Sequence, residues 1–121
     1  MSATTTTQFD LAAFTRAIEE RDAPTQLSMY AGDAEVILAD RITQPGSPRV
    51  LHGRGEIATW IEEVCARDMA HDVRATVVDD GGAAYVVACR YADGTNVLCA
   101  AVLELRDGLI AKLTGVQAWD E

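Results

Sequence analysis

Two side chains in this sequence have types and positions suited to proton transfer, Asp40 and His71. Asp40 closes the apolar run Val36-Ile37-Leu38-Ala39, and alternate residues of a strand point to the same face, so Asp40 is in register with Leu38. Either the strand has ended and Asp40 is in water, or that face looks into a cavity where the carboxylate acts as a general base. His71 opens a later strand-like run, and an imidazole there could act as the base itself or share a water with Asp40.

Other kinds of site are not indicated. The two histidines and the scattered thiols lack the spacing of metal ligands, and Gly53-Arg54-Gly55 is too short for a nucleotide-binding loop, so we expect no metal and no cofactor. The three cysteines, Cys65, Cys89 and Cys99, are an odd number without a C-x-x-C pair. We interpret them as reduced, mostly buried thiols of a cytoplasmic protein.

Composition is that of one ordinary globular domain. The chain has 121 residues, 49% of them hydrophobic and 24% charged. Its net charge of −9 argues against binding nucleic acid or an anionic membrane surface. The opening "MSATTTTQFD" lacks the features of a secretory signal, and no apolar run is long enough to span a bilayer. We expect a disordered tail over residues 1–7 and a single domain over residues 8–121.

The first half of the chain is mainly helical in pattern. Apolar residues at helical spacing predict a helix over residues 9–21, and Asp22-Ala23-Pro24 starts a short second helix that ends near Gly32. A strand over residues 35–40 and an irregular loop at residues 44–48 follow. The apolar residues Ile57, Trp60, Ile61 and Val64 then predict a third helix.

The second half consists of four strand-like runs over residues 71–79, 83–91, 96–106 and 109–119. The breaks between them are Asp80-Gly81-Gly82, Asp93-Gly94 and Asp107-Gly108, and Asp-Gly between apolar runs is a strong hairpin signal. The sequence therefore predicts a four-stranded antiparallel meander that follows the helices, which is an α+β fold.

Two-residue turns at both Asp-Gly sites would fix which side chains share a face. One face then holds the aromatic and small residues typical of a hollow: Tyr85, Val87, Cys89, Tyr91, Leu98, Ala100, Val102, Leu113, Gly115, Gln117 and Trp119. The opposite face is also largely apolar: Val86, Ala88, Arg90, Val97, Cys99, Ala101, Leu103, Ile110, Lys112, Thr114 and Val116. Three helices cannot cover both faces, so we expect a homodimer through the outer face. A three-residue loop at residues 80–82 turns His71 inward, and a two-residue loop turns it outward.

The inward face predicts a site for a small, flat and mostly apolar molecule with one or two oxygens. Tyr30, Leu38 and Trp60 are added to the wall from the first half of the chain. The expected ligand-binding residues are Tyr30, Leu38, Trp60, Tyr85, Val87, Cys89, Tyr91, Ala100, Val102, Leu113, Gly115, Gln117 and Trp119. Gln117 is notable because an inward amide needs a hydrogen-bonding partner, either a neighbour or a ligand.

The order of elements, together with "MYAGDAEVILAD", "LHGRGEIATWI", "YADGTNVL" and "RDGLIAKLTGVQAWD", resembles the nuclear transport factor 2-like superfamily over nearly the whole chain. The resemblance implies a cone-shaped α+β fold. That superfamily includes ketosteroid isomerases, SnoaL-like polyketide cyclases, scytalone dehydratase-like enzymes, limonene epoxide hydrolases and members that only bind or dimerise, so fold alone does not select a function.

Single residues refine what the resemblance implies. Asp40 looks like a displaced form of the isomerase base, and His71 matches the histidine that opens the first meander strand in scytalone dehydratase-like proteins. Phe14 and Val102 stand where the isomerases have hydrogen-bond donors, and neither can donate. We therefore expect cofactor-free acid/base chemistry, of isomerase, cyclase or dehydratase type, on a small apolar carbonyl compound. The alternative is a non-catalytic ligand-binding or dimerisation module.

Overall fold

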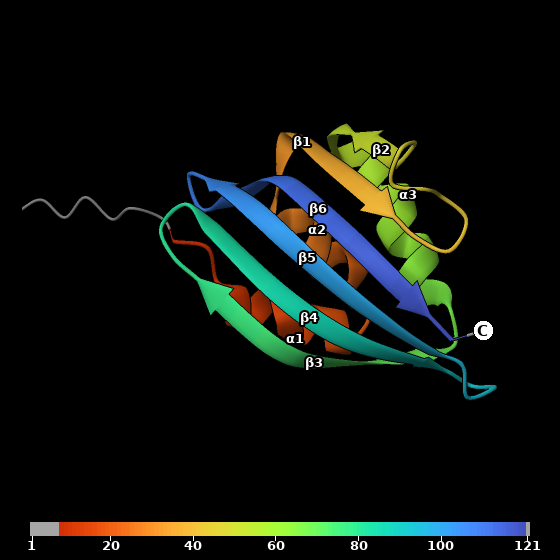
Figure 1. Ribbon diagram of the computed structural model, residues 1–121. Helices are drawn as coiled ribbons and strands as arrows, with labels where there is room; N and C mark the ends of the chain where they lie inside the picture. Colours follow the sequence, from red (N-terminus) through yellow and green to blue (C-terminus); the bar gives the residue numbers. More distant parts are fainter. Residues whose placement is uncertain (1–7, 121) are drawn as a thin grey trace, which may run out of the picture.

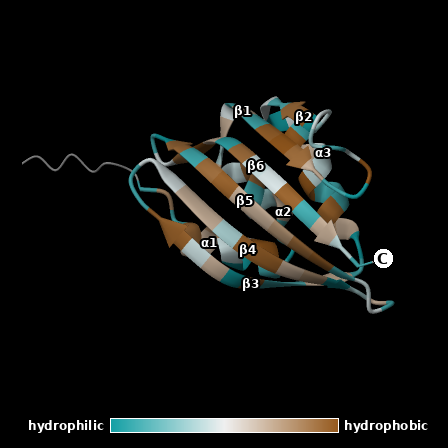
Figure 2. Ribbon diagram, in the orientation of Figure 1, coloured by the Kyte–Doolittle hydropathy of each residue, from teal (hydrophilic) through white to brown (hydrophobic). Residues whose placement is uncertain are grey.

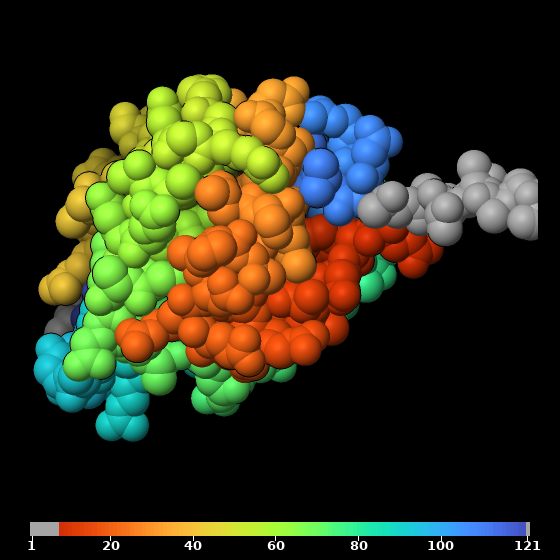
Figure 3. Space-filling model, turned by 180° about the vertical axis from the view of Figure 1, so that it is seen from behind, coloured from red at the N-terminus to blue at the C-terminus, as the bar shows by residue number. Residues whose placement is uncertain are grey.

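The computed structural model describes residues 8–120 and shows three helices packed on one face of a six-stranded sheet (Figure 1). The helices are α1 (Leu11–Glu19), α2 (Ala23–Ser28) and α3 (Gly53–Ala66). Seen from behind, they lie side by side over that face of the sheet (Figure 3). The predicted α+β order, helices first and meander last, is confirmed. The expected tail at residues 1–7 lies outside the described residues.

Local sequence explains where the first two helices begin. The side chain of Asp10 accepts a hydrogen bond from the amide of Ala13 at 2.9 Å, and Asp22 accepts one from the amide of Thr25 at 3.1 Å. Both aspartates thus cap a helix N-terminus, whose first amides have no partner within the helix.

Among the described residues, no helix is long and apolar enough to cross a membrane.

Arg54 joins the start of α3 to the end of α2. Its guanidinium donates to the carbonyl oxygens of Tyr30 at 3.1 Å, Ser28 at 3.3 Å and Leu27 at 3.4 Å. The last carbonyls of a helix lack partners within the helix, so this side chain satisfies groups that would otherwise need water. The contact holds α3 against the start of the sheet.

The strands are β1 (Tyr30–Ala39), β2 (Arg49–His52), β3 (Met69–Val78), β4 (Gly82–Tyr91), β5 (Asn96–Arg106) and β6 (Leu109–Trp119). They are ordered β2-β1-β6-β5-β4-β3, and every neighbouring pair is antiparallel except β1 and β6, which are parallel. The predicted four-strand meander is therefore β3 to β6. The sequence interpretation missed β2 and placed the start of β1 five residues too late.

The turn between β4 and β5 contains three residues, Ala92-Asp93-Gly94, and not the two that we predicted. The amide of Tyr91 donates to the carbonyl of Thr95, and the amide of Gly94 donates to the carbonyl of Tyr91, both at 2.9 Å. Gly94 has a φ of 92°, which glycine adopts without strain. One extra turn residue exchanges the two faces of the next strand. The prediction for β5 is therefore wrong: Val97, Cys99, Ala101 and Leu103 point toward the helices, and Leu98, Ala100 and Val102 point away.

A second irregularity restores the predicted faces of β6. Arg106 pairs with Leu109 across the two-residue Asp107-Gly108 turn, but the ladder then shifts by one residue, so that Glu104 pairs with Lys112. Leu113, Gly115, Gln117 and Trp119 therefore keep the inward face that the sequence predicts. Ile110, predicted to point outward, is instead fully buried because it lies on the turn side of this bulge and pairs with Leu105.

The sheet has an apolar surface that the helices leave uncovered. Leu98 is 51% exposed and Val102 is 58% exposed, on the side of the sheet that faces the viewer in Figures 1 and 2. We call this surface the outer apolar face, and its members are Val77, Ala84, Val86, Leu98, Ala100, Val102 and Val116. Large exposed apolar areas of this kind are unusual on monomers.

Candidate functional site

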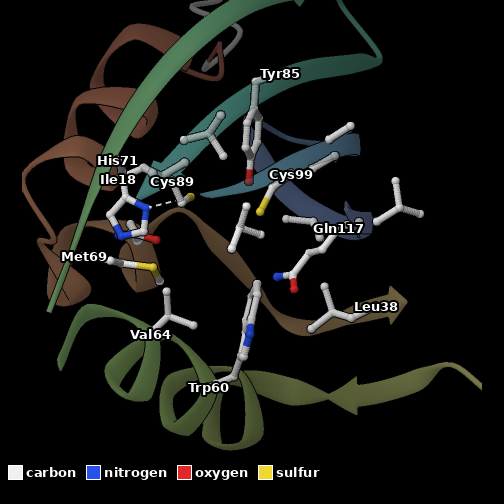
Figure 4. Close-up of a pocket in the computed structure, with 18 of the residues that line it drawn as sticks. Ile18, Leu38, Trp60, Val64, Met69, His71, Tyr85, Cys89, Cys99 and Gln117 are labelled. Atoms are coloured by element: carbon white, nitrogen blue, oxygen red, sulfur yellow. Dashed lines mark hydrogen bonds between the residues drawn. The ribbon is translucent and has the colours of Figure 1, made fainter. Parts of the chain in front are cut away.

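A cavity of about 110 Å³ lies between the inner face of the sheet and the helices (Figure 4). It is lined by all but one of the predicted ligand-binding residues: Tyr30, Leu38, Trp60, Tyr85, Val87, Cys89, Tyr91, Ala100, Leu113, Gly115, Gln117 and Trp119. Ala100 borders it although its register points the side chain to the outer face. Val102 does not line it, because the extra turn residue before β5 places its side chain on the outer apolar face.

The cavity also has wall residues that the sequence interpretation missed. The correct turn length before β5 would have placed Val97, Cys99 and Ala101 there. Other missed residues lie on the same face of a helix or strand as residues that we did assign to the core. The additional lining residues are Phe14, Ile18, Gln26, Val64, Arg67, Met69, Val97, Cys99, Ala101 and Val116.

His71, Cys89 and Cys99 form a polar cluster on the inner face of the sheet (Figure 4). His71 on β3 pairs directly with Cys89 on β4, and the imidazole Nδ1 lies 3.1 Å from the Cys89 sulfur. Cys99 on β5 lies diagonally across from Cys89, because its direct partner is Val87. The three side chains therefore bring an imidazole and two thiols to one part of the cavity wall.

The thiolate form of Cys89 is stabilised by its neighbours. The pKa of Cys89 lies well below its ordinary value, first because the Cys99 thiol donates a hydrogen bond to it and then because His71 contributes a hydrogen bond and its charge, while burial opposes the shift. The same thiol pair and burial raise the pKa of Cys99. Burial, with the nearby Cys99 and Cys89, also raises the pKa of Tyr85. When Cys89 and Cys99 together have lost one proton, the negative charge is therefore on the Cys89 sulfur.

A bulge in β3 turns His71 toward the cavity. Close to the β3–β4 turn, Ala75 pairs with Val86 and points outward, but the ladder shifts between Ala75 and Val73, so that Val73 pairs with Val87. The extra residue is Arg74. Bulges of this kind re-aim side chains near functional sites. The orientation of His71, which the sequence left open between inward and outward, is inward.

Gln117 presents an amide to the cavity. Its Oε1 accepts a hydrogen bond from the indole nitrogen of Trp119 at 2.9 Å, and its amide nitrogen points into the cavity (Figure 4). Trp119 is itself held by stacking on Tyr91, with ring centroids 5.7 Å apart. Because the oxygen is engaged, the amide NH₂ group is left to donate to a bound molecule.

Arg67 lies at the exposed edge of the cavity. Its guanidinium Nη1 donates to the hydroxyl of Tyr91 at 3.3 Å, and the backbone carbonyl of Arg67 accepts from the guanidinium of Arg21 at 2.6 Å. Arg67 follows α3 directly, so these contacts connect the end of that helix to the segment between α1 and α2 and to β4. It is the charged side chain in the described cavity wall.

Asp40 does not lie in the cavity wall. The strand β1 ends at Ala39, and the Asp40 carboxylate caps the turn that follows: its Oδ1 accepts from the amides of Ile42 at 2.9 Å and Thr43 at 3.0 Å. The hydroxyl of Thr43 also contacts this oxygen at 3.1 Å. The expectation that Asp40 shares the inward face of Leu38 is therefore corrected, since the strand alternation does not continue to residue 40.

The hydrogen-bond donors that ketosteroid isomerases would need are not found at the matching positions. Phe14 borders the cavity, whereas Val102 is on the outer apolar face. The inward neighbours of Val102, which are Ala101 and Leu103, are apolar as well. Within residues 8–120, no three His, Cys, Asp or Glu side chains are grouped so as to hold a metal ion.

Comparison with known proteins connects this arrangement to a family. The family model described as a SnoaL-like domain matches residues 11–113. A search of curated proteins finds no match.

Solved structures share the fold at low sequence identity. An NTF2-like protein of unknown function from Mesorhizobium loti has a TM-score of 0.78 and 16% identity, over 89% of this chain and 87% of that one. A protein from Kribbella flavida, provisionally named a ketosteroid isomerase, has a TM-score of 0.74 and 21% identity, over 92% of this chain and 75% of that one. A provisionally named isomerase from Bacillus subtilis has a TM-score of 0.67 and 18% identity, over 91% and 83% of the two chains.

Proposed function

Because this chain belongs to the SnoaL-like domain family of the nuclear transport factor 2-like superfamily, we propose that its cavity binds a small, mainly apolar carbonyl compound and catalyses proton transfer on it without a cofactor. The observation that carries the proposal is the presence of one imidazole, that of His71, and one donating amide, that of Gln117, in the same mostly apolar cavity wall (Figure 4). An apolar pocket with few convergent polar groups is typical of small-molecule sites.

The chemistry assigned to these groups is general acid/base catalysis. In molecules in which Cys89 keeps its proton and the imidazole is neutral, His71 takes a proton from the carbon next to the carbonyl group and returns it at the same or another carbon. The Gln117 amide nitrogen donates to the carbonyl oxygen, on which negative charge develops, while Trp119 holds the amide in place. Asp40 has no part in this scheme, because its carboxylate is engaged in the turn after β1.

The volume of the cavity limits the ligand. At about 110 Å³ it is smaller than the engineered cavity of ~150 Å³ that holds benzene in another protein. We therefore propose that the small, flat ligand predicted from the sequence is no larger than about one ring. Larger ligands would require Trp60 or Met69 to move away from the wall.

The alternative is a binding module without catalysis. It is favoured by the small number of polar groups in the cavity and by the absence of any carboxylate among its described lining residues. Under this alternative the same compounds bind and no proton is exchanged.

We also propose that two copies of the chain associate through the outer apolar face. The exposure of Val102 and Leu98 supports this proposal, because association would remove them from water.

The free thiols Cys65, Cys89 and Cys99 support a reducing, cytoplasmic location.

The test is the exchange of hydrogen for deuterium at the carbon next to the carbonyl group of cyclohexanone. In deuterated buffer, wild-type protein should speed deuterium incorporation next to the carbonyl, as followed by NMR, and His71→Gln should abolish most of that increase. His52→Gln is the matched control, because His52 is exposed and contacts Glu35 at 3.4 Å, away from the cavity wall. Equal exchange with wild type and His71→Gln would contradict catalysis by His71. Thermal stabilisation by cyclohexanone without exchange would favour the binding module.

A further inference from the structure

We infer that Cys89 is a nucleophile in this cavity, which adds reversibly to an electrophilic carbon such as the β-carbon of an α,β-unsaturated carbonyl compound. The inference rests on the proposed function in one respect, because the compound has to enter the same cavity. It goes further because it assigns a covalent step to a residue that proton transfer does not use.

Geometry pairs the Cys89 sulfur with a base. The β3–β4 register sets His71 directly opposite Cys89, and the Nδ1–Sγ distance of 3.1 Å is a hydrogen-bond contact. An imidazole in this position removes the thiol proton and leaves a thiolate, which is the nucleophilic form of cysteine. The neighbouring Cys99 thiol lowers the pKa of Cys89 further.

The charges around Cys89 favour a thiolate. The titratable or charged side chains in the cavity wall are His71 from β3, Tyr85 and Tyr91 from β4, Cys99 from β5, Tyr30 from β1 and Arg67 after α3. None of these is a carboxylate, so the described wall offers no fixed negative charge to oppose the sulfur. The one fixed cation in the described wall, Arg67, lies at the exposed edge and donates to the Tyr91 hydroxyl.

The addition needs no oxidant, reductant or second substrate. His71 accepts the Cys89 proton, the sulfur donates an electron pair to the β-carbon, and the carbon–carbon π bond shifts its electrons toward the carbonyl group. The imidazolium then returns the proton to the α-carbon, so that S and H have added across the double bond. The reverse sequence expels the thiolate, and Gln117 can donate to the carbonyl oxygen in both directions.

Cys89 and Cys99 are both free thiols, and their places on the sheet disfavour a disulfide between them. Cys89 pairs with Val97 and Cys99 pairs with Val87, so the two cysteines are diagonal neighbours on adjacent strands. Diagonal neighbours are separated by roughly 7–8 Å, and a disulfide needs Cα atoms within about 7 Å. This spacing is at or beyond the limit for a disulfide.

The third cysteine provides an internal control. Cys65 lies on α3, and its sulfur accepts from the Gln26 amide at 3.6 Å. Burial raises the pKa of Cys65, with the Gln26 hydrogen bond opposing the shift. Cys65 should thus behave as an ordinary thiol in the same sample.

Alkylation by iodoacetamide at several pH values, with peptide mass mapping, tests the thiolate. The rate at Cys89 should change less than about threefold between about pH 6.5 and about pH 8.5, whereas the rate at Cys65 should rise roughly tenfold per pH unit. His71→Gln and Cys99→Ala should each make the Cys89 profile steeper. A purely structural effect of these variants would change the rate equally at all pH values. A Cys89 profile as steep as that of Cys65, or no alkylation of Cys89, would overturn the inference.

Cyclohexenone and cyclohexanone separate this inference from the proposed function. Cyclohexenone should add its own mass at Cys89, the adduct should be lost on dilution, and Cys89→Ala should not form it. If cyclohexanone stabilises the protein and is exchanged but cyclohexenone forms no adduct, the covalent inference fails and the proposed function stands. If cyclohexenone labels Cys89 while cyclohexanone neither binds nor exchanges, the proposed function fails and the nucleophile stands.

Discussion

Nδ1 of His71 lies 3.1 Å from Sγ of Cys89, on adjacent strands that would not align these residues without a bulge. Near the β3–β4 turn the register places Val77 opposite Ala84, and its continuation would pair His71 with Arg90 on the outer face. The extra residue Arg74 shifts the pairing by one, so the imidazole enters the cavity. A one-residue irregularity in β3 thus creates the base–thiol pair on which the chemistry proposed for this cavity depends.

Replacing Gly115 with alanine should destabilise the protein by roughly 1–3 kcal/mol, the usual cost of overfilling a packed site. A Cβ atom at residue 115 would lie 3.1 Å from Cδ2 of Leu38 and 3.4 Å from Cδ2 of Leu113, inside the cavity wall. Urea unfolding measures the change.

Gly55→Ala is the matched control for Gly115→Ala. Gly55 lies within α3, and nothing comes within 4 Å of an added Cβ there. This replacement should stabilise the protein by roughly 0.5–1 kcal/mol, because alanine favours the helix. Equal effects of the two replacements would show that residue 115 is not in tight contact with Leu38.

The buried tyrosines predict a loss of stability at alkaline pH. Burial raises the pKa of Tyr30 and of Tyr85 above the ordinary value of 10.0. A group with a raised folded-state pKa stabilises the fold fully below its unfolded value and loses this contribution as pH rises. The free energy of unfolding should therefore fall above about pH 10, by about 1.4 kcal/mol per pH unit for each tyrosine.

Tyr85→Phe should reduce the steepness of that alkaline fall, as measured by urea unfolding at a series of pH values. Its hydroxyl group is then missing in both the folded and the unfolded chain, so one of the two titrating groups no longer contributes. An unchanged slope in this variant would mean that Tyr85 ionises in the folded protein as easily as in the unfolded chain.

The sequence predicted the elements of the meander well because its turns have strong local signals. The Asp93-Gly94 and Asp107-Gly108 turns led to predicted strands over residues 96–106 and 109–119. These are the observed bounds of β5 and β6. The face of the sheet to which a side chain points is harder to predict, since one added residue in a turn or a bulge reverses it. The prediction for β5 was wrong for this reason, and Cys99 was consequently assigned to the outer face.

Asp40 shows the other limit of the sequence argument. Alternation put it in register with Leu38 and left open whether it faces a cavity or lies in water after the strand has ended, because the end of a strand depends on the hydrogen bonds of the following turn. In the structure Thr43 and Ile42 provide those bonds and end the strand. The mainly apolar wall of the cavity was predictable in part, because β4 and the second half of β6, whose faces were assigned correctly, contribute Tyr85, Val87, Leu113 and other wall residues.

Asp40→Ala should therefore reduce stability by about 1 kcal/mol, as for other lost side-chain caps of backbone amides. Asp40→Asn should cost less, because the amide oxygen can still accept from Ile42 and Thr43. Urea unfolding compares the two variants. A similar large loss in both would indicate that the negative charge, and not the acceptor oxygen, is what the turn requires.

Val102→Glu should convert the proposed dimer into monomers. Val102 is 58% exposed on the outer apolar face, so a glutamate there costs the single chain little but would bury an unpaired charge in the dimer. Ala101, which the sequence placed on this face, is unsuitable for the test because it is buried in the core. Sedimentation velocity measures the mass of the species in solution.

Ile42→Glu is the matched control for Val102→Glu. Ile42 is 88% exposed in the loop after β1, away from the outer apolar face, so the same new charge there should leave the dimer intact. If Val102→Glu sediments as a dimer like Ile42→Glu, the subunits associate through another surface. If wild-type protein already sediments as a monomer, the outer apolar face is not a self-association site, and the exposed Leu98 and Val116 must contact a different partner or water.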